Sequence, residues 1–261
     1  MLTAIFIFII CFAASTIGGI CGIGGGVVIK PLLDAVGVMS VSTVSFLSGL
    51  TVLAMTCVNV WKSRKSNELE PARSVPLGIG AAVGGVLGKS MFSALKAAVQ
   101  ADRAVGAVQS IVLGIMVLGT LLYVVFKSRI KTRNVSGWLL PVVIGLLLGV
   151  CSSFLGIGGG PMNLAVLYYF FSMDTKKAAI NSILIILLSQ IASLLMSLVT
   201  GSVPTFEWGY LAAMVAAGIL GGFLSARLHK KLSADLTDKL FIGLLAVIVF
   251  ICVYNTARML A

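Results

Sequence analysis

Long apolar runs separated by short polar breaks fill the whole chain. They predict ten helical segments, at about 2–20, 27–37, 40–61, 75–95, 104–126, 137–155, 161–171, 174–200, 206–229 and 236–257. Eight of these segments are long enough to cross a hydrocarbon core of about 30 Å. The segments 27–37 and 161–171 rise only about 17 Å each, so they cannot cross it as helix alone.

A glycine motif precedes each short segment. Gly22–Gly26 and Gly156–Gly160 both read Gly-Ile-Gly-Gly-Gly and lie 134 positions apart in a chain of 261 residues, which predicts two tandem halves of similar architecture. Glycine accepts positive φ and weakens a helix. Each half should therefore hold a long helix, an unwound turn and a short helix that starts inside the membrane, where irregular backbone must line protein or a watery cavity.

The composition fits this pattern and sets the class of protein. Hydrophobic residues make up 59% of the chain and charged residues 10%, and the mean hydropathy is +1.12. These values predict an all-α, polytopic protein of an inner, plasma or similar membrane, because the apolar runs are too long for the strands of an outer-membrane barrel. The opening residues 1–15 lack a basic region, so we assign them to the first helix and not to a signal peptide.

The basic residues test how the halves are related. If all ten segments change sides, one face receives Lys96, Arg103 and Arg258, and Lys30 and Lys89 fall inside segments. The other face receives the remaining fourteen: Lys62, Arg64, Lys65, Arg73, Lys127, Arg129, Lys131, Arg133, Lys176, Lys177, Arg227, Lys230, Lys231 and Lys239. Four crossings per half would scatter these charges over both faces. The positive-inside rule therefore favours two inverted five-segment repeats, 1–126 and 137–261, joined by a cytoplasmic linker at 127–136, with both termini outside. The net charge of +11 then reflects topology, and no nucleic acid partner is predicted.

Local signals agree with the repeat. Ser40 and Asp174 stand at the N-cap positions that follow the two short segments. Gly84-Gly85 is answered by Gly221-Gly222 at a spacing of 137, and such glycine pairs are typical of close helix packing in membranes.

The sequences GIGGGVVIKPLL and GVCSSFLGIGGGPMNLAVLYYF, with the helix start Lys-Lys-Ala-Ala-Ile-Asn-Ser, resemble the sulfite exporter TauE/SafE family of transporters. The resemblance implies secondary transport of a small sulfur-containing anion: sulfite, thiosulfate or an organosulfonate such as sulfoacetate. Members differ in substrate and direction. The chain has no P-loop, so a proton or sodium gradient, or the substrate's own gradient, would drive transport. The first motif continues as Val27–Lys30 and the second as Pro161–Leu164, so the two half-sites need not contribute equally.

The candidate site follows from the needs of an anion inside a membrane. Helix N-termini offer partial positive charge, and broken helices in inverted-repeat transporters direct theirs at anionic groups near the midplane. We predict that the substrate-binding residues are Gly24, Gly25, Gly26, Lys30, Ser48, Ser152, Ser153, Gly158, Gly159, Gly160, Asn163, Asn181 and Ser182. A lower-ranked group extends the polar helix faces: Thr51, Thr56, Asn59, Ser189, Gln190 and Ser193. Any single one of these could instead bond a neighbouring helix carbonyl.

Three basic side chains need separate interpretation. Lys30 either balances the substrate or pairs with Asp34, four residues later on the same helix. Lys89 is predicted near an outer helix end, as an interfacial lysine that reaches toward water. His229 lies in a basic stretch and is predicted on the cytoplasmic surface.

The sequence also bears on two other functions, a passive anion channel and a membrane enzyme. A passive anion channel uses the same helix ends and polar linings, so it stays open as an alternative. A membrane enzyme is disfavoured because the one histidine is predicted on the cytoplasmic surface, so no catalytic set of nucleophile, histidine and carboxylate can be assembled. A dinucleotide-binding fold is disfavoured because no strand precedes the glycine motifs. The five cysteines form no CxxC pair, so no metal or cofactor is predicted. The sulfur anion, transport direction, coupling ion and oligomeric state are left open.

Overall fold

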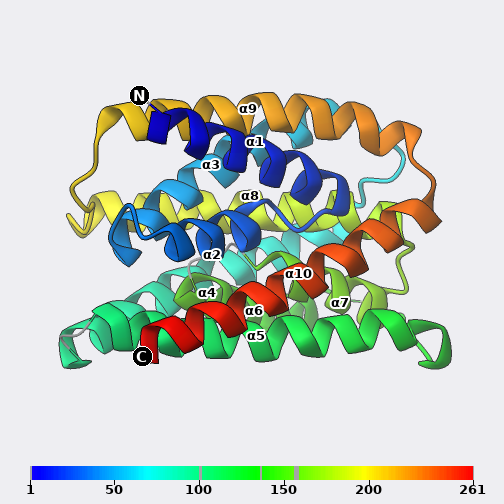
Figure 1. The fold of residues 1–261 in the computed structure, drawn as a ribbon. Helices are drawn as coiled ribbons and strands as arrows, with labels where there is room; N and C mark the ends of the chain where they lie inside the picture. The colour runs from blue at the N-terminus through cyan, green and yellow to red at the C-terminus, as the bar shows by residue number, and fades with distance from the viewer. Residues whose placement is uncertain (1, 100–101, 136, 156–158, 261) are drawn as a thin grey trace.

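The computed structural model describes residues 2–99, 102–135, 137–155 and 159–260. Within them the chain forms ten α-helices and a short 3₁₀ turn, η1, with no β-strand (Figure 1). The elements are α1 Leu2–Cys21, α2 Gly26–Val36, α3 Val41–Ser63, α4 Pro71–Val99, α5 Asp102–Phe126, η1 Lys127–Arg129, α6 Leu139–Leu155, α7 Gly160–Phe171, α8 Thr175–Val199, α9 Trp208–Lys231 and α10 Ala234–Leu260. Each helix lies on one of the ten segments predicted from the apolar pattern, so the all-α fold class is confirmed.

Helix lengths separate the spanning elements from the broken ones. Seven helices (α1, α3, α4, α5, α8, α9 and α10) are long and apolar enough to cross a membrane. α2 has 11 residues and α7 has 12, as the two short predicted segments require. Large apolar side chains cover the outside of the long helices; Ile115 is 67% exposed and Phe250 is 74% exposed. In water such a surface would be unfavourable, so the chain is an integral membrane protein.

The caps that start the helices after the breaks were predicted correctly. The Ser40 side chain accepts a hydrogen bond from the Thr43 backbone N–H at 3.2 Å, and Asp174 accepts one from the Lys177 N–H at 3.0 Å. Each cap satisfies a backbone donor that the first helical turn leaves without a partner. These caps fix where α3 and α8 begin.

Glycine allows α4 and α6 to pack backbone to backbone. A methyl group added at Gly80, Gly84 or Gly88 would overlap the backbone of α6, and one added at Gly145 or Gly149 would overlap the backbone of α4. Contact this close lets small-residue faces gain dispersion energy without a hydrophobic driving force between helices. The predicted packing role of the Gly84-Gly85 pair is confirmed for Gly84.

The same kind of contact joins α9 to two helices of the first half. Gly221 packs against Ser15 of α1, and Gly222 packs against the backbone of Met55 on α3. Further along, Gly19 of α1 lies against Ser225 of α9. The residue numbers of the contacting positions increase together in the two helices, so α1 and α9 run parallel. The packing role predicted for the Gly221-Gly222 pair is confirmed.

Parallel and antiparallel contacts sort six helices into two groups. α3 lies parallel to α1 and α9, while α4 lies parallel to α6 and α8. For α4 and α8 this follows because Ala81 contacts Ser189 and, two turns later, Lys89 contacts Ser197. The two groups run in opposite directions, since Gly49 of α3 lies beside Gln190 of α8 whereas Val52 and Ile186 both border Gly24. α5 and α10 are also antiparallel to each other, because their opposite ends meet.

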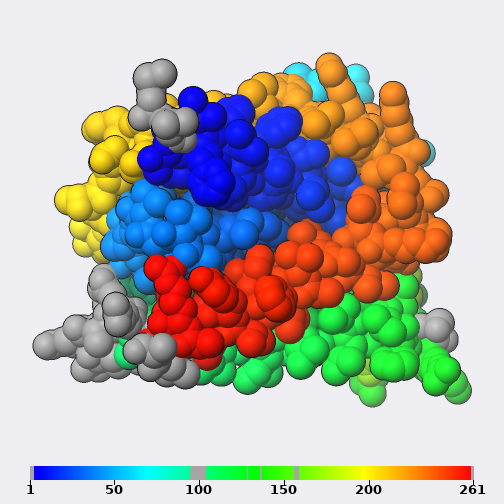
Figure 2. Space-filling view, viewed as in Figure 1, coloured from blue at the N-terminus to red at the C-terminus, as the bar shows by residue number. Residues whose placement is uncertain are grey.

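The helices form a bundle with two distinct ends. Both chain termini and the α8–α9 connection lie at the left end in Figure 1, and the α3–α4, α5–α6 and α9–α10 connections lie at the right end. On the face seen in Figure 2, α2 lies between α1 and α10, so two long helices flank the short one. Ion pairs join the elements at the right end, including Lys127 with Asp238 at 2.6 Å and Lys177 with Glu70 at 3.3 Å. We call this the basic end.

One surface prediction was wrong. His229 is buried, with 5% of its surface exposed. Its Nδ1 lies 3.0 Å from the carbonyl of Ile20, and its Nε2 lies 3.8 Å from the Glu68 carboxylate. The histidine fastens the end of α9 to the end of α1, because the parallel packing of these helices brings their last turns together.

Candidate functional site

Positive φ angles interrupt the chain at both glycine motifs. In the first motif Gly22, Gly24 and Gly25 have φ of 79°, 70° and 34°, and α2 begins at Gly26. In the second, Gly159 has φ of 80°, and α7 follows with Pro161 in its first turn. Residues with side chains rarely adopt these angles. The predicted breaks are therefore confirmed where the structure describes them; the predicted site residue Gly158 lies outside the described residues.

The two breaks touch each other inside the protein. A methyl group added at Gly160 would overlap the backbone of Ile23, in the middle of the first motif. A methyl group added at Gly22 would likewise overlap the backbone of Ala179 on α8, and Gly18 lies against the backbone of Gly25. The N-termini of α2 and α7 thus begin in buried positions near one another, as predicted for the two half-helices.

A cavity of about 620 Å³ lies beside the breaks, between α3, α4 and α8. It extends from the α8–α9 connection, at the end that carries both termini, to α5 and α6. Phe46, Leu50, Leu53, Phe92 and Leu194 contribute to an apolar part of its wall. The polar part consists of Lys89, Gln109, Gln190 and eight serines: Ser42, Ser45, Ser93, Ser152, Ser153, Ser193, Ser197 and Ser202.

Lys89 sets the charge of this cavity. Its Nζ donates to the Ser193 carbonyl at 3.2 Å and to the Ser197 hydroxyl. Among the described residues that line the cavity, Lys89 is the one charged side chain, and the rest of the polar lining is hydroxyl or amide. Lys89 has no carboxylate partner among the described residues, and a cation of this kind in a concave, partly apolar site attracts anions and repels cations. Lys89 faces the cavity because α8 packs alongside α4, and its interfacial position stays a prediction.

The predicted serines before the second break are part of the cavity. Ser152 and Ser153, at the end of α6, both line it. Ser152 also borders Gly159, so the start of α7 lies directly behind the cavity wall. Gln190 and Ser193, from the lower-ranked group, line the cavity as well.

Other predicted residues lie near the breaks but do not line the cavity. The Ser48 hydroxyl donates to the Ser45 carbonyl at 3.1 Å within α3. Asn163 is 2% exposed and Ser182 is fully buried. The Ser182 hydroxyl has no hydrogen-bond partner in the described part of the chain. The first-motif glycines and Gly159–Gly160 are also absent from the lining, so they shape the backbone behind it.

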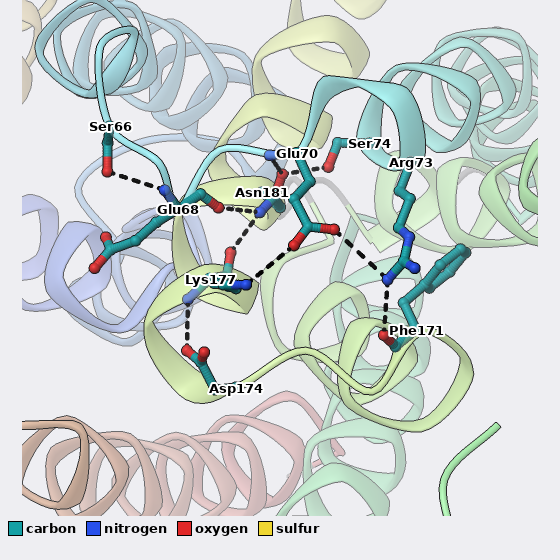
Figure 3. A network of polar contacts seen from close by, with 9 residues as sticks. All are labelled: Ser66, Glu68, Glu70, Arg73, Ser74, Phe171, Asp174, Lys177 and Asn181. Carbon is teal, nitrogen blue, oxygen red and sulfur yellow. Dashed lines mark hydrogen bonds and ion pairs between the residues drawn. The ribbon is translucent and has the colours of Figure 1, made fainter. Parts of the chain in front are cut away.

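Asn181 has a structural role at the basic end (Figure 3). Its Oδ1 accepts from the Glu70 N–H at 2.8 Å and from the Ser74 hydroxyl at 2.5 Å. Its Nδ2 donates to the carbonyls of Glu68 at 2.9 Å and Lys177 at 2.7 Å. These four bonds use both donors and both acceptor positions of the amide. Asn181 therefore holds the α3–α4 connection against α8 and has no capacity left for an anion.

Ion pairs extend this network across three helices (Figure 3). The Glu70 carboxylate lies 3.3 Å from the Lys177 Nζ and 3.5 Å from the Arg73 guanidinium. Arg73 also donates to the Phe171 carbonyl at 3.2 Å. The start of α4, the end of α7 and the start of α8 are thus tied together at the basic end, opposite the cavity mouth.

Lys30 pairs with Asp34 and does not line the cavity. Its Nζ lies 3.0 Å from the Asp34 carboxylate and donates to the Gln109 Oε1 at 3.0 Å. The two charged side chains are only 4% and 5% exposed. Gln109 in turn donates through Nε2 to the Phe154 carbonyl at 2.6 Å and also lines the cavity. Of the two interpretations of Lys30, pairing with Asp34 is the one that the structure supports.

We expect Lys30→Met to lower the free energy of unfolding by about 3–5 kcal/mol, because it leaves the Asp34 charge buried without a partner. Lys30→Met combined with Asp34→Leu should cost much less, since no charge remains. Unfolding of the purified variants in detergent, followed by circular dichroism, measures both. Equal stability of the single and double variants would show that the pair contributes little.

Paired broken helices within a bundle of membrane-spanning helices, beside a cavity whose charge favours anions, are features of a membrane transport protein. Residues 7–251 match the family model described as sulfite exporter TauE/SafE, so the chain belongs to this family of membrane transporters. The predicted family is confirmed, and its members are transporters and not enzymes.

A comparison with individual proteins also finds a membrane transporter, over a shorter stretch of the chain. The chain is 29% identical over 91 residues to "Probable membrane transporter protein YunE" of Bacillus subtilis (strain 168). The match covers 35% of this chain and 32% of that protein, so the chain matches about a third of the relative's length. No solved structure matches the chain.

Proposed function

We propose that the chain is a secondary transporter of small sulfur-containing anions, such as sulfite, thiosulfate or organosulfonates like sulfoacetate, and that the cavity around Lys89 binds them. The observation that carries this proposal is the set of described residues that line the cavity, whose polar groups are one ammonium, several hydroxyls and two amides. A sulfur oxyanion presents several acceptor oxygens, and ammonium and hydroxyl donors match them.

Individual groups are positioned to take part. Ser45 lines the cavity, and its hydroxyl has no hydrogen-bond partner among the described residues. Ser152 and Ser153 add hydroxyls next to the start of α7, whose N-terminus supplies partial positive charge behind them. The anion is then held by one full charge and several weaker donors, which favours release as well as binding. The α2 N-terminus lies deeper, next to the second break, and would meet the anion only after a conformational change.

We assign the two halves, 1–126 and 137–261, to inverted repeats joined by the linker 127–136. In support, the helix pairs repeat when the halves are exchanged: α1 packs on α9 as α6 packs on α4, and α2 packs on α10 as α7 packs on α5. The corresponding helices α3 and α8 run in opposite directions, as do α5 and α10. Inverted repeats of this kind allow a transporter to expose one site alternately to each side.

The one-sided cavity favours a transporter over a passive channel. The cavity reaches the end that carries the termini, whereas the Asn181 and Glu70 network ties three helices together at the basic end (Figure 3). We propose that this is an outward-facing state in the bacterial inner membrane, with the basic end in the cytoplasm and both termini outside.

Labelling from one side tests this orientation. In a cysteine-free background, required because Cys57 is exposed, Ser202→Cys should react with an impermeant maleimide added to whole cells. Arg129→Cys, at the basic end, should react only after the membrane is opened. The opposite pattern would exclude both the orientation and the outward-facing assignment.

The substrate class is tested by thermal stabilisation of the purified protein. Thiosulfate, sulfite and sulfoacetate should raise the melting temperature, because each offers two or more oxygens to Lys89 and the serines. Taurine should stabilise less, since its ammonium group meets no carboxylate among the described lining residues. No response to any sulfur anion would overturn the proposed function.

A further inference from the structure

We propose that Asp34 is the binding site of a coupling proton, so that a proton and a doubly charged anion bind to the protein together. This inference rests on the transport function proposed above. It concerns a buried charged pair that anion binding in the cavity does not itself use.

The pair is isolated from water and incompletely bonded. Lys30 and Asp34 face each other across one turn of α2 and are more than nine-tenths buried. One carboxylate oxygen of Asp34 accepts from Lys30, while the other, Oδ1, has no partner among the described residues. A carboxylate that served only to balance Lys30 would gain from a second donor at this position. The open oxygen is a place where a proton can add without displacing another hydrogen bond.

The described groups around Lys30 and Asp34 add no buried charge that would neutralise either of them. From α5, the neutral amide of Gln109 contacts Lys30. From α10, the buried thiol of Cys252 lies close enough to interact with both charges, and Arg258 donates to the Ala35 carbonyl at the exposed end of α2. Asn255, also on α10, donates to the Pro31 carbonyl. Among these described neighbours, Lys30 is the one buried cation beside Asp34.

Gln109 connects the pair to the cavity. Its Oε1 accepts from Lys30, its Nε2 donates to the Phe154 carbonyl on α6, and its side chain lines the cavity. The side chains of Gln109 and Lys30 therefore connect the cavity to Asp34. Rotation of Gln109, or a shift of α6 near the second break, would open the Lys30–Asp34 pair to water in the cavity.

Charge balance explains why the proton and the anion should bind together. The cavity contributes one positive charge from Lys89, and the Lys30–Asp34 pair contributes none in sum. A bound dianion therefore leaves one negative charge without compensation in a poorly solvated region, which is unfavourable. Addition of a proton to the Asp34 carboxylate gives a neutral acid and frees the charge of Lys30, so the site becomes neutral. No bond of the anion forms or breaks in this step.

The test is uptake of labelled thiosulfate into proteoliposomes at zero membrane potential. With an inward proton gradient, the wild-type protein should accumulate the anion by about tenfold for each unit of pH difference if one proton accompanies each anion. Asp34→Asn should still bind and exchange thiosulfate but lose this accumulation. Asp235→Asn is the matched control, because Asp235 also pairs with a lysine four residues away but is 75% exposed.

The proposal is overturned if Asp34→Asn still accumulates thiosulfate in response to the proton gradient. It is also overturned if accumulation by the wild type does not depend on the proton gradient. If Asp34→Asn does not fold, Lys30→Gln combined with Asp34→Asn removes both charges and keeps hydrogen-bonding groups. By the same charge balance this double variant should bind thiosulfate more weakly, and accumulation driven by the proton gradient in it would overturn the proposal. A pH-sensitive dye should also report one proton taken up per anion by the wild type, and no proton uptake contradicts the proposal. If the wild type neither binds nor exchanges any sulfur anion, the transport function fails instead.

Discussion

Replacement of Lys89 by methionine is expected to weaken anion binding by roughly 15- to 150-fold, the equivalent of a lost hydrogen bond to a charged group. The change keeps the length and apolar stem of the side chain but removes the one cationic group of the described cavity lining. Ser193 and Ser197 lose a donor that they now receive from Lys89, yet both are on a helix that is otherwise intact. Titration calorimetry on the purified variant measures the effect.

Lys62 provides the matched control. It lies in the last turn of α3, where its Nζ is 4.7 Å from the centre of the Trp61 ring, and it does not line the cavity. Lys62→Met should bind the anion with unchanged affinity. Lys89→Arg should keep most of the binding because it keeps the charge. Wild-type affinity in Lys89→Met would show that the cavity does not select anions by this lysine.

Replacement of Gly159 by valine is expected to reduce the initial rate of transport by more than about tenfold, because a β-branched residue at a φ of 80° stores backbone strain of about 1–3 kcal/mol. Its side chain would also press on Ser152, which lines the cavity, and approach the Asn163 amide. Strain and contact both act at the start of α7. Uptake into proteoliposomes, normalised to the amount of folded protein, separates transport from expression.

Gly243→Val is the matched control, because it makes the same substitution at a glycine away from the breaks. It lies within α10, on an exposed face with no atom near the position of an added side chain. Gly243→Val should leave both folding and transport close to wild type. If Gly159→Val lowers the folded yield as much as it lowers transport, the second break has a packing role and not a functional one.

The helices and their breaks could be predicted from the sequence because they depend on local features. Apolar runs define the spanning helices, and the repeated glycine motif defines where two of them are interrupted. Ser40 and Asp174 act as caps through bonds to residues three positions later, so short-range reasoning was sufficient.

The site was predicted less completely because it depends on contacts between distant segments. Ser152 and Ser153 line the cavity as expected, but Asn181 is occupied by the α3–α4 connection, which no local pattern reveals. Lys89 resembles an interfacial lysine in the sequence. Its inward position follows from the packing of α8 beside α4, and the serines at 189, 193 and 197, spaced by one helical turn, were the available signal.

Counterflow tests most directly whether the protein is a transporter that alternates access to an anion site. Proteoliposomes loaded with unlabelled thiosulfate are diluted into a trace of labelled thiosulfate, with no ion gradient or membrane potential. The account predicts that the wild type transiently concentrates labelled thiosulfate inside, above the level outside. Each unlabelled anion that leaves brings the binding site to the outer side, where it can take up a labelled anion. Lys89→Met should show only weak counterflow. Labelled anion that enters only to equilibrium, with a steady conductance, would contradict the account and identify a passive channel.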